Sequence, residues 1–499
     1  MLQLLAFTLA LLISAYSPEP PALADPPTDE LKVKITPESR EAAAIAKVQT
    51  VSSEGKLRVS GTGAFIGESL FVTSLQVIDQ AHSAQIVTAC CGHFDVEGVV
   101  AANDEADLVF LRVKTKPGDI KWLEIAASSP AKGDQIRVAV VIVDSGVALL
   151  GSAAMGTDTW PGYGPMVRVD YPFGGLLATS PVLNDQGQLT AVAVIGGAHE
   201  TTLASVIKPG MLKPLMRADT VIPLKEFAER EPSDCVKARR ELFAGIAMEE
   251  RGNRRGAVDA YKKSLALDPG QWRAQWLLGV SLDMQGKGEE SIDVLKTAAK
   301  MCPLFSEPVY SLGLVHLKLK RDAEAIAYFD EAAKIDPGYG SIHAMRGVAL
   351  HRQGKSDEAI ASTQRATEVE PDNIAHFRNL TFLCNTAGKM ELLAPAWRRY
   401  TNAKPDDADG WIMLSSVLDS ATDLDEVVRC CRRATELQPE NCRNRLQFAA
   451  ALGMQEKYDE ALKEIEKCLK ANPKDSEAKK LKKLIEEGKS KPAAQPLEK

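Results

Sequence analysis

A ladder of seven prolines is the feature that most constrains this 499-residue chain. Successive members are 34 residues apart, at Pro269, Pro303, Pro337, Pro371, Pro405, Pro439 and Pro473. A strict period of this length indicates an array of similar helical units, each of which buries its apolar face against its neighbours. Such arrays present long grooves to other proteins. Nearly half of the chain is therefore expected to form a binding surface.

Small and bulky residues recur at fixed positions within each period. Small residues stand 24 residues before the proline at Gly245, Gly279, Gly313 and Gly347, and 12 before it at Ala257, Ser291, Ala325, Ala359 and Ala461. Bulky residues stand 8 before it at Tyr261, Leu295, Phe329, Trp397 and Ile465. This pattern resembles the tetratricopeptide repeat (TPR), in which two helices meet at the small residues. It implies an all-α TPR solenoid of seven repeats over 238–474, with a capping helix at 475–487.

Repeats five and six depart from this pattern. Thr381 and Ser415 stand in place of the glycine, and Leu393 and Val427 stand in place of the alanine. Larger side chains at positions of close helix approach predict looser packing there. The period itself is unbroken, so the array is expected to continue through both repeats.

The N-terminal half has a different texture. Residues 43–216 contain short β-branched runs separated by Gly, Asn and Asp-rich turns, a pattern typical of an all-β barrel or sandwich. A polar lead-in at 25–42 precedes them. A charged, Pro-punctuated segment at 217–237 follows, and it predicts a linker or a short docking helix. The tail at 488–499 is expected to be disordered.

Residues 43–216 resemble the trypsin-like serine proteases, and within them the HtrA-like (DegP-like) bacterial branch. The resemblance rests on three segments, which are Gly61-Thr62-Gly63-Ala64-Phe65-Ile66, Val72-Thr73-Ser74-Leu75-Gln76-Val77-Ile78 and Asp104-Glu105-Ala106-Asp107-Leu108. A fourth, Leu176-Leu177-Ala178-Thr179-Ser180-Pro181, falls where the family carries its nucleophile. The implied fold is a trypsin-like double barrel, which makes the whole chain a multidomain protein.

The residues at the three positions of the family's catalytic triad are not those that its chemistry requires. Gln76 stands in the histidine position and Ala178 in the serine position, so that only Asp107 remains. Serine hydrolysis needs a hydroxyl nucleophile and an imidazole that accepts its proton. A glutamine amide is not basic and alanine has no nucleophile. Leu176 also replaces a glycine of the oxyanion hole. These substitutions predict a pseudoprotease and not an enzyme.

A rearranged active site is the alternative interpretation. Thr179 and Ser180 lie close in sequence to the missing nucleophile, and His82, His93 and His199 are the histidines of this region. Hydroxyls in turns and strands more often bond to nearby backbone. Under this alternative the chain is a serine endopeptidase whose substrates are recruited by the repeats. A third possibility is that the β domain is a structural cap without a ligand.

Along the first helix of each repeat, one stripe of residues is apolar through most of the array. The period places eight residues on the concave face, namely Leu242, Ile246, Trp276, Val280, Tyr310, Leu314, Val348 and Phe382. TPR proteins that capture acidic tails use basic residues there, so this stripe favours a hydrophobic peptide, or an amphipathic helix, of a partner protein. The alternatives are that the stripe is inter-repeat core or is covered by residues 217–237.

The remaining features concern location and cofactors. Leu2 to Ala15 is apolar and precedes Ala22-Leu23-Ala24, a pattern that predicts a signal peptide at 1–24 and export to the periplasm or cell exterior. An uncleaved membrane anchor is the alternative, and no other segment reaches a membrane-spanning length. The net charge of −7 without basic runs argues against nucleic acid. The nine cysteines lack zinc-site spacing and are read as core thiols, so no metal or cofactor is expected.

Together these patterns predict an exported protein-interaction scaffold. The repeats are expected to bind a peptide or partner protein, and the trypsin-like domain is expected to be inactive.

Overall fold

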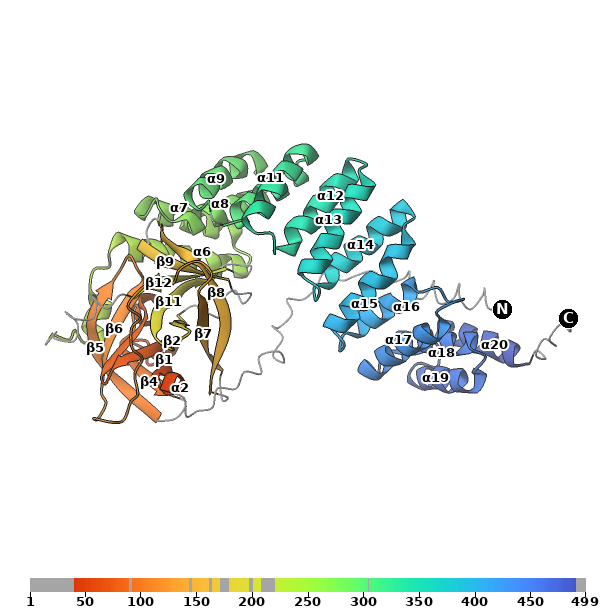
Figure 1. Cartoon of the computed structure of the whole chain (residues 1–499), viewed down its shortest axis with the longest axis horizontal. Helices are drawn as coiled ribbons and strands as arrows, with labels where there is room; N and C mark the ends of the chain where they lie inside the picture. Colours follow the sequence, from red (N-terminus) through yellow and green to blue (C-terminus); the bar gives the residue numbers. More distant parts are fainter. Residues whose placement is uncertain are drawn as a thin grey trace. The chain divides into compact units, whose positions relative to one another are not determined.

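The computed structural model describes residues 40–88, 92–142, 146–160, 164–170, 179–196, 201–207, 220–303 and 305–490. These residues form two compact units, one that ends at Val315 and another that begins at His316. The first unit holds all of the described β-strands and the helices of the repeats that precede residue 316. The second holds the remaining helices. Figure 1 labels the elements in chain order.

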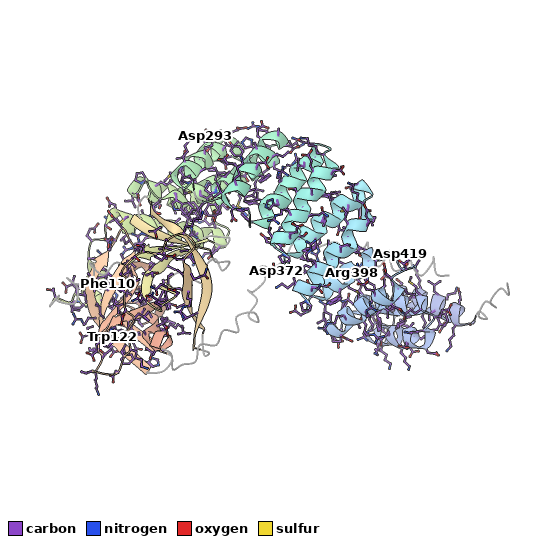
Figure 2. All side chains as sticks on the ribbon, in the orientation of Figure 1. Phe110, Trp122, Asp293, Asp372, Arg398 and Asp419 are labelled. Carbon is purple, nitrogen blue, oxygen red and sulfur yellow. The ribbon has the colours of Figure 1, made fainter. Side chains whose placement is uncertain are left out.

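The first barrel closes in the strand order β1-β2-β3-β6-β5-β4, with antiparallel pairing throughout. Its elements are α2 (Arg40–Ala44), β1 (Ile45–Val51), β2 (Leu57–Gly67), β3 (Leu70–Ser74), α3 (Leu75–Ile78), β4 (Ser83–Thr88), β5 (Gly92–Asn103) and β6 (Leu108–Val113). Alternating residues fill the interior, where Phe65 and Phe71 meet edge to face at 5.0 Å between ring centroids. Phe110 of β6 is buried in the apolar cluster between the two barrels, whereas Trp122 in the following connection is exposed (both are labelled in Figure 2).

The second barrel closes in the order β10-β11-β12-β9-β8-β7. Its strands are β7 (Gln135–Ile142), β8 (Gly146–Trp160), β9 (Gly164–Asp170), β10 (Pro181–Asn184), β11 (Leu189–Gly196) and β12 (Thr201–Val206). One apolar cluster joins the two barrels, because Ile45 and Leu108 of the first pack with Leu183 and Leu189 of the second. The predicted all-β double barrel is confirmed.

The segment that the sequence identified as a linker or docking helix packs on the first barrel. Ile222 pairs with Val99 of β5 through two backbone hydrogen bonds of 2.7 and 2.9 Å. The short helix α5 (Leu224–Glu229) then buries Leu224 and Phe227 in the core of the first barrel. Of the segment 217–237, the described residues are therefore held by strand pairing and apolar burial and do not form a free tether.

Fifteen helices follow in the described part of the chain. They are α6 (Asp234–Glu250), α7 (Arg254–Leu267), α8 (Trp272–Met284), α9 (Gly288–Met301), α10 (Glu307–Lys318), α11 (Asp322–Ile335), α12 (Gly340–Arg352), α13 (Ser356–Val369), α14 (Ile374–Ala387), α15 (Leu393–Ala403, preceded by a 3-10 turn at Met390–Leu392), α16 (Ala408–Val417), α17 (Leu424–Leu437), α18 (Cys442–Met454), α19 (Tyr458–Ala471) and α20 (Ser476–Lys489). The predicted helical repeat array is confirmed, and α20 lies where the capping helix was expected.

Each proline of the ladder follows the end of the second helix of a repeat. Each proline stands two residues after the last helical residue, as Pro269 does after Leu267 and Pro473 after Ala471. Proline has no amide hydrogen to donate and restricts the residue before it, so the helix ends there. Glycine recurs 24 residues before the proline because the paired helix leaves no room for a side chain. A Cβ on Gly279 would lie 2.6 Å from Leu295 Cγ of that helix.

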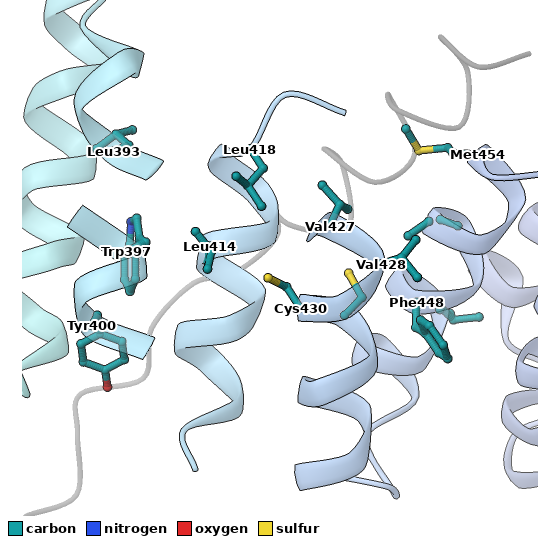
Figure 3. Packing of buried hydrophobic residues seen from close by; sticks show 14 of the residues in the cluster. Leu393, Trp397, Tyr400, Leu414, Leu418, Val427, Val428, Cys430, Phe448 and Met454 are labelled. Atoms are coloured by element: carbon teal, nitrogen blue, oxygen red, sulfur yellow. The ribbon is translucent and has the colours of Figure 1, made fainter. Parts of the chain in front are cut away.

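The helices of repeat five, α14 and α15, approach each other less closely than the helix pairs of repeats one, two, four, six and seven, as the larger side chains predict, but the space between them is filled. Trp397 is fully buried, and its indole Nε1 donates to Thr381 Oγ1 at 2.9 Å. Phe377 and Tyr400 surround the indole, with ring centroids 5.5 Å from it. The threonine that replaces glycine is thus the hydrogen-bond partner of the tryptophan. Figure 3 shows Trp397 and Tyr400 together in this core, with Leu414, Val427 and Cys430 on the helices that follow.

Candidate functional site

The remaining triad carboxylate lies in a tight turn before β6. Asp107 has a φ of 52° and is buried, with 3% of its surface exposed. Its main-chain carbonyl accepts a hydrogen bond from Leu75 N at 2.9 Å, which fixes the turn against α3. Its Oδ2 accepts from Ser74 Oγ at 2.5 Å, and the backbone amide of Gln76 also bonds to the carboxyl group. Asp107 is therefore held on the α3 side by contacts within the first barrel domain.

The other carboxylate oxygen is bound by the repeat array. Arg239 of α6, the first repeat helix, places Nη1 2.7 Å from Asp107 Oδ1. Both side chains are almost fully buried, at 8% and 4% exposure. Burial raises the pKa of Asp107, while the Arg239 guanidinium and the Ser74 hydroxyl act in the opposite direction. A guanidinium stays charged in proteins, so this contact is a buried ion pair.

Further contacts fix α6 and the segment before it at this place. Arg240 makes a bidentate pair with Asp79, with both N···O distances at 2.7 Å, and this bond raises the pKa of Arg240. Arg230 pairs with Asp104 at 2.9 Å. Although burial raises the pKa of Asp104, Arg230 and Ser233 hold it below its usual value. Three arginines within residues 230–240 thus each form an ion pair with an aspartate of the first barrel domain.

Gln76 lies beside this ion pair. It is half-buried in α3 and lines a pocket of about 280 Å³ together with Asp79, Arg239, Arg240 and Phe243, and with Leu75, Gln80, Asp107 and Val236. The pocket is bounded by α3 on one side and α6 on the other. Its polar lining consists of amides, carboxylates and guanidinium groups. The possible general bases among the described residues that line it are the carboxylates of Asp79 and Asp107. Each of these is already paired with an arginine of α6.

The segment around the expected nucleophile is described only in part. Ala178 lies outside the described residues, as do Leu176 and His199. Thr179 is buried with a φ of 82°, a strained conformation for a β-branched residue. Its Oγ1 accepts from Thr62 N at 2.6 Å. Gly61 permits this approach, because a Cβ there would lie 2.5 Å from Val77 and 3.1 Å from the Thr179 hydroxyl.

The other candidates for a rearranged site are held in structural contacts. Ser180 is 1% exposed, and its carbonyl accepts from Ala193 N at 2.8 Å. The backbone amide of His82 donates to Val51 O at 2.9 Å. His93 is an exposed residue of β5. Neither Ser180, Thr179 nor His82 is among the residues that line the pocket at Asp107. The described contacts therefore do not bring a hydroxyl and an imidazole together there.

The concave stripe of the repeats divides into a buried and an open part. Leu242 is 2% exposed and packs with Tyr261, so it belongs to the core and not to a groove. Trp276 is half-buried, and its Nε1 donates to Ser311 Oγ at 2.9 Å. It packs with Trp272 and Phe305 on Met166 of the second barrel. Ile246, Val280, Tyr310, Leu314 and Val348 are half-buried.

Phe382 is the open member of the stripe. Its side chain is 58% exposed, and its ring meets His351 of α12 edge to face at 5.6 Å between centroids. A large exposed aromatic ring held by a neighbouring ring is a favourable anchor for an apolar ligand. Among the eight residues of the stripe, Phe382 is therefore the one most accessible to a ligand.

The arginines of α6 were missed at the sequence level. The one available signal was Asp107 itself, because a buried carboxylate without its histidine requires another partner. Nothing in the spacing from residue 107 to residue 239 identifies which cation supplies it. Among the described residues there is no cluster of His, Cys, Asp and Glu that could hold a metal ion. None of the described helices has the length and apolar character that crossing a bilayer requires.

Comparison with known families agrees with both halves of the fold. Residues 61–192 match the trypsin-like peptidase domain, and residues 244–304 and 317–381 match two tetratricopeptide repeat families. The chain is thus a trypsin-like domain fused to a TPR array. No curated protein matches the chain.

Several solved structures resemble part of the chain. The MamA protein is 20% identical, with a TM-score of 0.31, and the match covers 35% of this chain and 94% of that one. YrrB, described as a TPR protein with an unusual peptide-binding site, is 17% identical, with a TM-score of 0.31 and coverage of 38% of this chain and 97% of that one. MamA from Desulfovibrio magneticus RS-1 is 18% identical, with a TM-score of 0.31 and coverage of 34% and 97%.

Proposed function

We propose that this chain is an exported protein-interaction scaffold in which the TPR array binds a hydrophobic segment of a partner protein. The trypsin-like domain is catalytically inactive and anchors the first repeat. The buried ion pair between Asp107 and Arg239 is the observation that carries this proposal, because in it the one remaining triad residue binds a residue of the first repeat helix, α6.

The chemistry of the pair supports inactivity. In a working triad the aspartate accepts a hydrogen bond from the histidine and stabilises the imidazolium that forms. Here Asp107 Oδ1 contacts a guanidinium and Oδ2 accepts from Ser74. Gln76 stands in the histidine position, and its amide cannot accept a proton from a nucleophile. The carboxylate therefore has a charged partner that is permanently protonated, and no proton is transferred.

The binding function rests on the open part of the stripe. Phe382 exposes 58% of its surface and Val348 and His351 lie on the neighbouring repeat. An amphipathic helix or extended peptide with apolar anchors suits such a surface. Export follows from the apolar segment at Leu2 to Ala15 and the small residues Ala22 and Ala24. The partner is a protein, and nucleic acid is not expected.

Site-specific photo-crosslinking tests the binding surface. A photoreactive phenylalanine analogue is placed at Phe382 in the full chain, and at Glu358, an exposed residue of α13, as the matched control. A synthetic amphipathic peptide with a leucine face is the probe. Cross-linking at position 382 that exceeds the control, and that excess unlabelled peptide suppresses, is expected. Equal cross-linking at both positions contradicts the proposal.

A further inference from the structure

Equivalent positions in the repeats bring two helices close together at one point. The first turn of the first helix meets the last turns of the second helix, 26 residues later in the sequence. In repeat one Ser264 Oγ donates to the carbonyl of Ala238 at 2.8 Å, and both residues are buried. In repeat six Ala408 and Ala434 occupy the same positions and pack in one cluster. In these two repeats the contact is made by small side chains, which lie close to each other.

In repeat seven both of these positions are cysteines. Cys442 begins α18 and Cys468 lies near the end of α19. The Cys468 thiol donates to the Cys442 carbonyl at 3.5 Å, which reproduces the contact of Ser264 with Ala238. Cys468 is buried and Cys442 is half-buried. Burial, together with a side-chain hydrogen bond to Cys442, raises the pKa of the Cys468 thiol to about 12.

We propose that Cys442 and Cys468 form a disulfide bond that closes the last repeat in an oxidising compartment. The occurrence of this bond in the cell rests on the proposed export, whereas the pairing rests on the geometry alone. The more accessible Cys442 thiolate attacks a disulfide oxidant, releases one thiolate and forms a mixed disulfide. Cys468 then attacks Cys442 Sγ and releases the second thiolate. Two protons and two electrons leave the pair, and the oxidant becomes two thiols.

The other described cysteines offer no such pair. Cys430 and Cys431 are consecutive in α17, where neighbouring side chains point in different directions. Burial raises the pKa of each of these thiols to about 12. Cys302 and Cys384 are buried at other places in the array. Of the cysteines in the described part of the chain, Cys235 and Cys442 alone are half-exposed, and Cys442 has a second thiol beside it.

The position of the bond gives it a role. End repeats of a solenoid pack on one side only and open more readily than internal repeats. Here α20 covers α19 through Ala478, Leu481 and Ile485, and a cross-link between α18 and α19 would hold the surface on which it packs. A disulfide across 26 residues chiefly restricts the opened state. The bond therefore keeps the final repeat and its cap closed.

Peptide mass spectrometry identifies the pairing in two samples of the full chain. One is purified, reduced protein treated with oxidised glutathione, and the other is recovered from the periplasm of an expressing bacterium with its thiols blocked at lysis. A peptide cross-linked through Cys442 and Cys468 is expected in both, and Cys430→Ser should retain it. The first sample showing only glutathione on Cys442, or another pairing, overturns the proposal. Failure to recover the chain from the periplasm would contradict export and leave the pairing of the first sample standing, whereas chain recovered there without the bond would overturn its formation in the cell.

Hydrogen exchange tests the role of the bond. Cys468→Ser is the matched variant, because Ser264 shows that a hydroxyl is accommodated at this position. In the oxidised protein, amide exchange in α18 to α20 should be on the order of 100-fold slower than in the variant. Exchange in α12 and α13 should be the same in both. Equal exchange of α18 to α20 in the oxidised protein and the variant would rule out a stabilising role.

Discussion

The triad remnant at Asp107 and the core of repeat five have each lost a residue typical of their family, with opposite outcomes. In the barrel Gln76 replaces a histidine, and a charged residue from a distant helix now pairs with the carboxylate that is left. In repeat five Thr381 replaces a glycine, and Trp397 of the paired helix bonds to its hydroxyl. The second exchange preserves the role of the position, which is packing. Under the proposed function, the first converts a catalytic position into a structural one.

The largest predicted effect concerns the buried ion pair. Arg239→Ala leaves Asp107 buried without its cation, and we expect a loss of about 3–5 kcal/mol in the free energy of unfolding, measured by urea denaturation of the full chain. The double variant Asp107→Asn/Arg239→Met removes both charges and should recover most of this loss. A double variant as unstable as Arg239→Ala would show that the ion pair itself is not what matters.

The neutral contact in repeat five should matter less. Thr381→Val keeps the shape of the side chain but leaves Trp397 Nε1 without its acceptor, so we expect a loss of about 1–3 kcal/mol. Thr381→Ser keeps the hydroxyl and serves as the control. Thermal unfolding monitored by tryptophan fluorescence provides the measurement. If valine were as stable as serine here, repeat five would be held by its apolar contacts alone.

The second arginine of α6 should contribute less again. Arg240 and Asp79 are about one-third and one-fifth exposed, so solvent screens their attraction. We expect Arg240→Gln to lower the free energy of unfolding by about 0.2–1 kcal/mol, and the loss to shrink at high salt. A loss as large as that of Arg239→Ala would erase the distinction between the buried and the half-exposed pair.

Phe382 should show almost no effect on stability. With 58% of its surface exposed, Phe382→Ser is expected to change the free energy of unfolding by less than about 0.5 kcal/mol. The same variant should weaken binding of the amphipathic peptide at least about tenfold, as removal of an aromatic anchor does. Titration of labelled peptide by fluorescence anisotropy separates the two effects. Unchanged affinity would place the peptide elsewhere on the array.

Local patterns in the sequence were sufficient for the fold. The prolines predict where helices end, because the effect of proline acts on its own helix and its immediate neighbour. The paired small and bulky residues predict which helices pack together, as at Gly279 and Leu295. Strand alternation predicts an all-β barrel or sandwich, and the resemblance to the trypsin-like proteases implies the double barrel. Each of these signals acts over a few residues or one repeat.

Contacts between distant residues could not be predicted in this way. The pairing of Asp107 with Arg239 joins residues far apart in the sequence, and it depends on how α5 and α6 dock on the first barrel. At Thr381 the sequence predicted the wider helix spacing, but not that the threonine hydroxyl accepts a hydrogen bond from the Trp397 indole.

Reaction of the full chain with a fluorophosphonate probe, alongside a casein cleavage assay, tests most directly whether the barrel has lost its chemistry. An active trypsin-like protease serves as the positive control. With Asp107 paired to Arg239 and Ser180 buried, neither covalent labelling nor casein cleavage should occur. Labelling of the wild-type chain that disappears in Ser180→Ala would contradict this account and establish a serine endopeptidase.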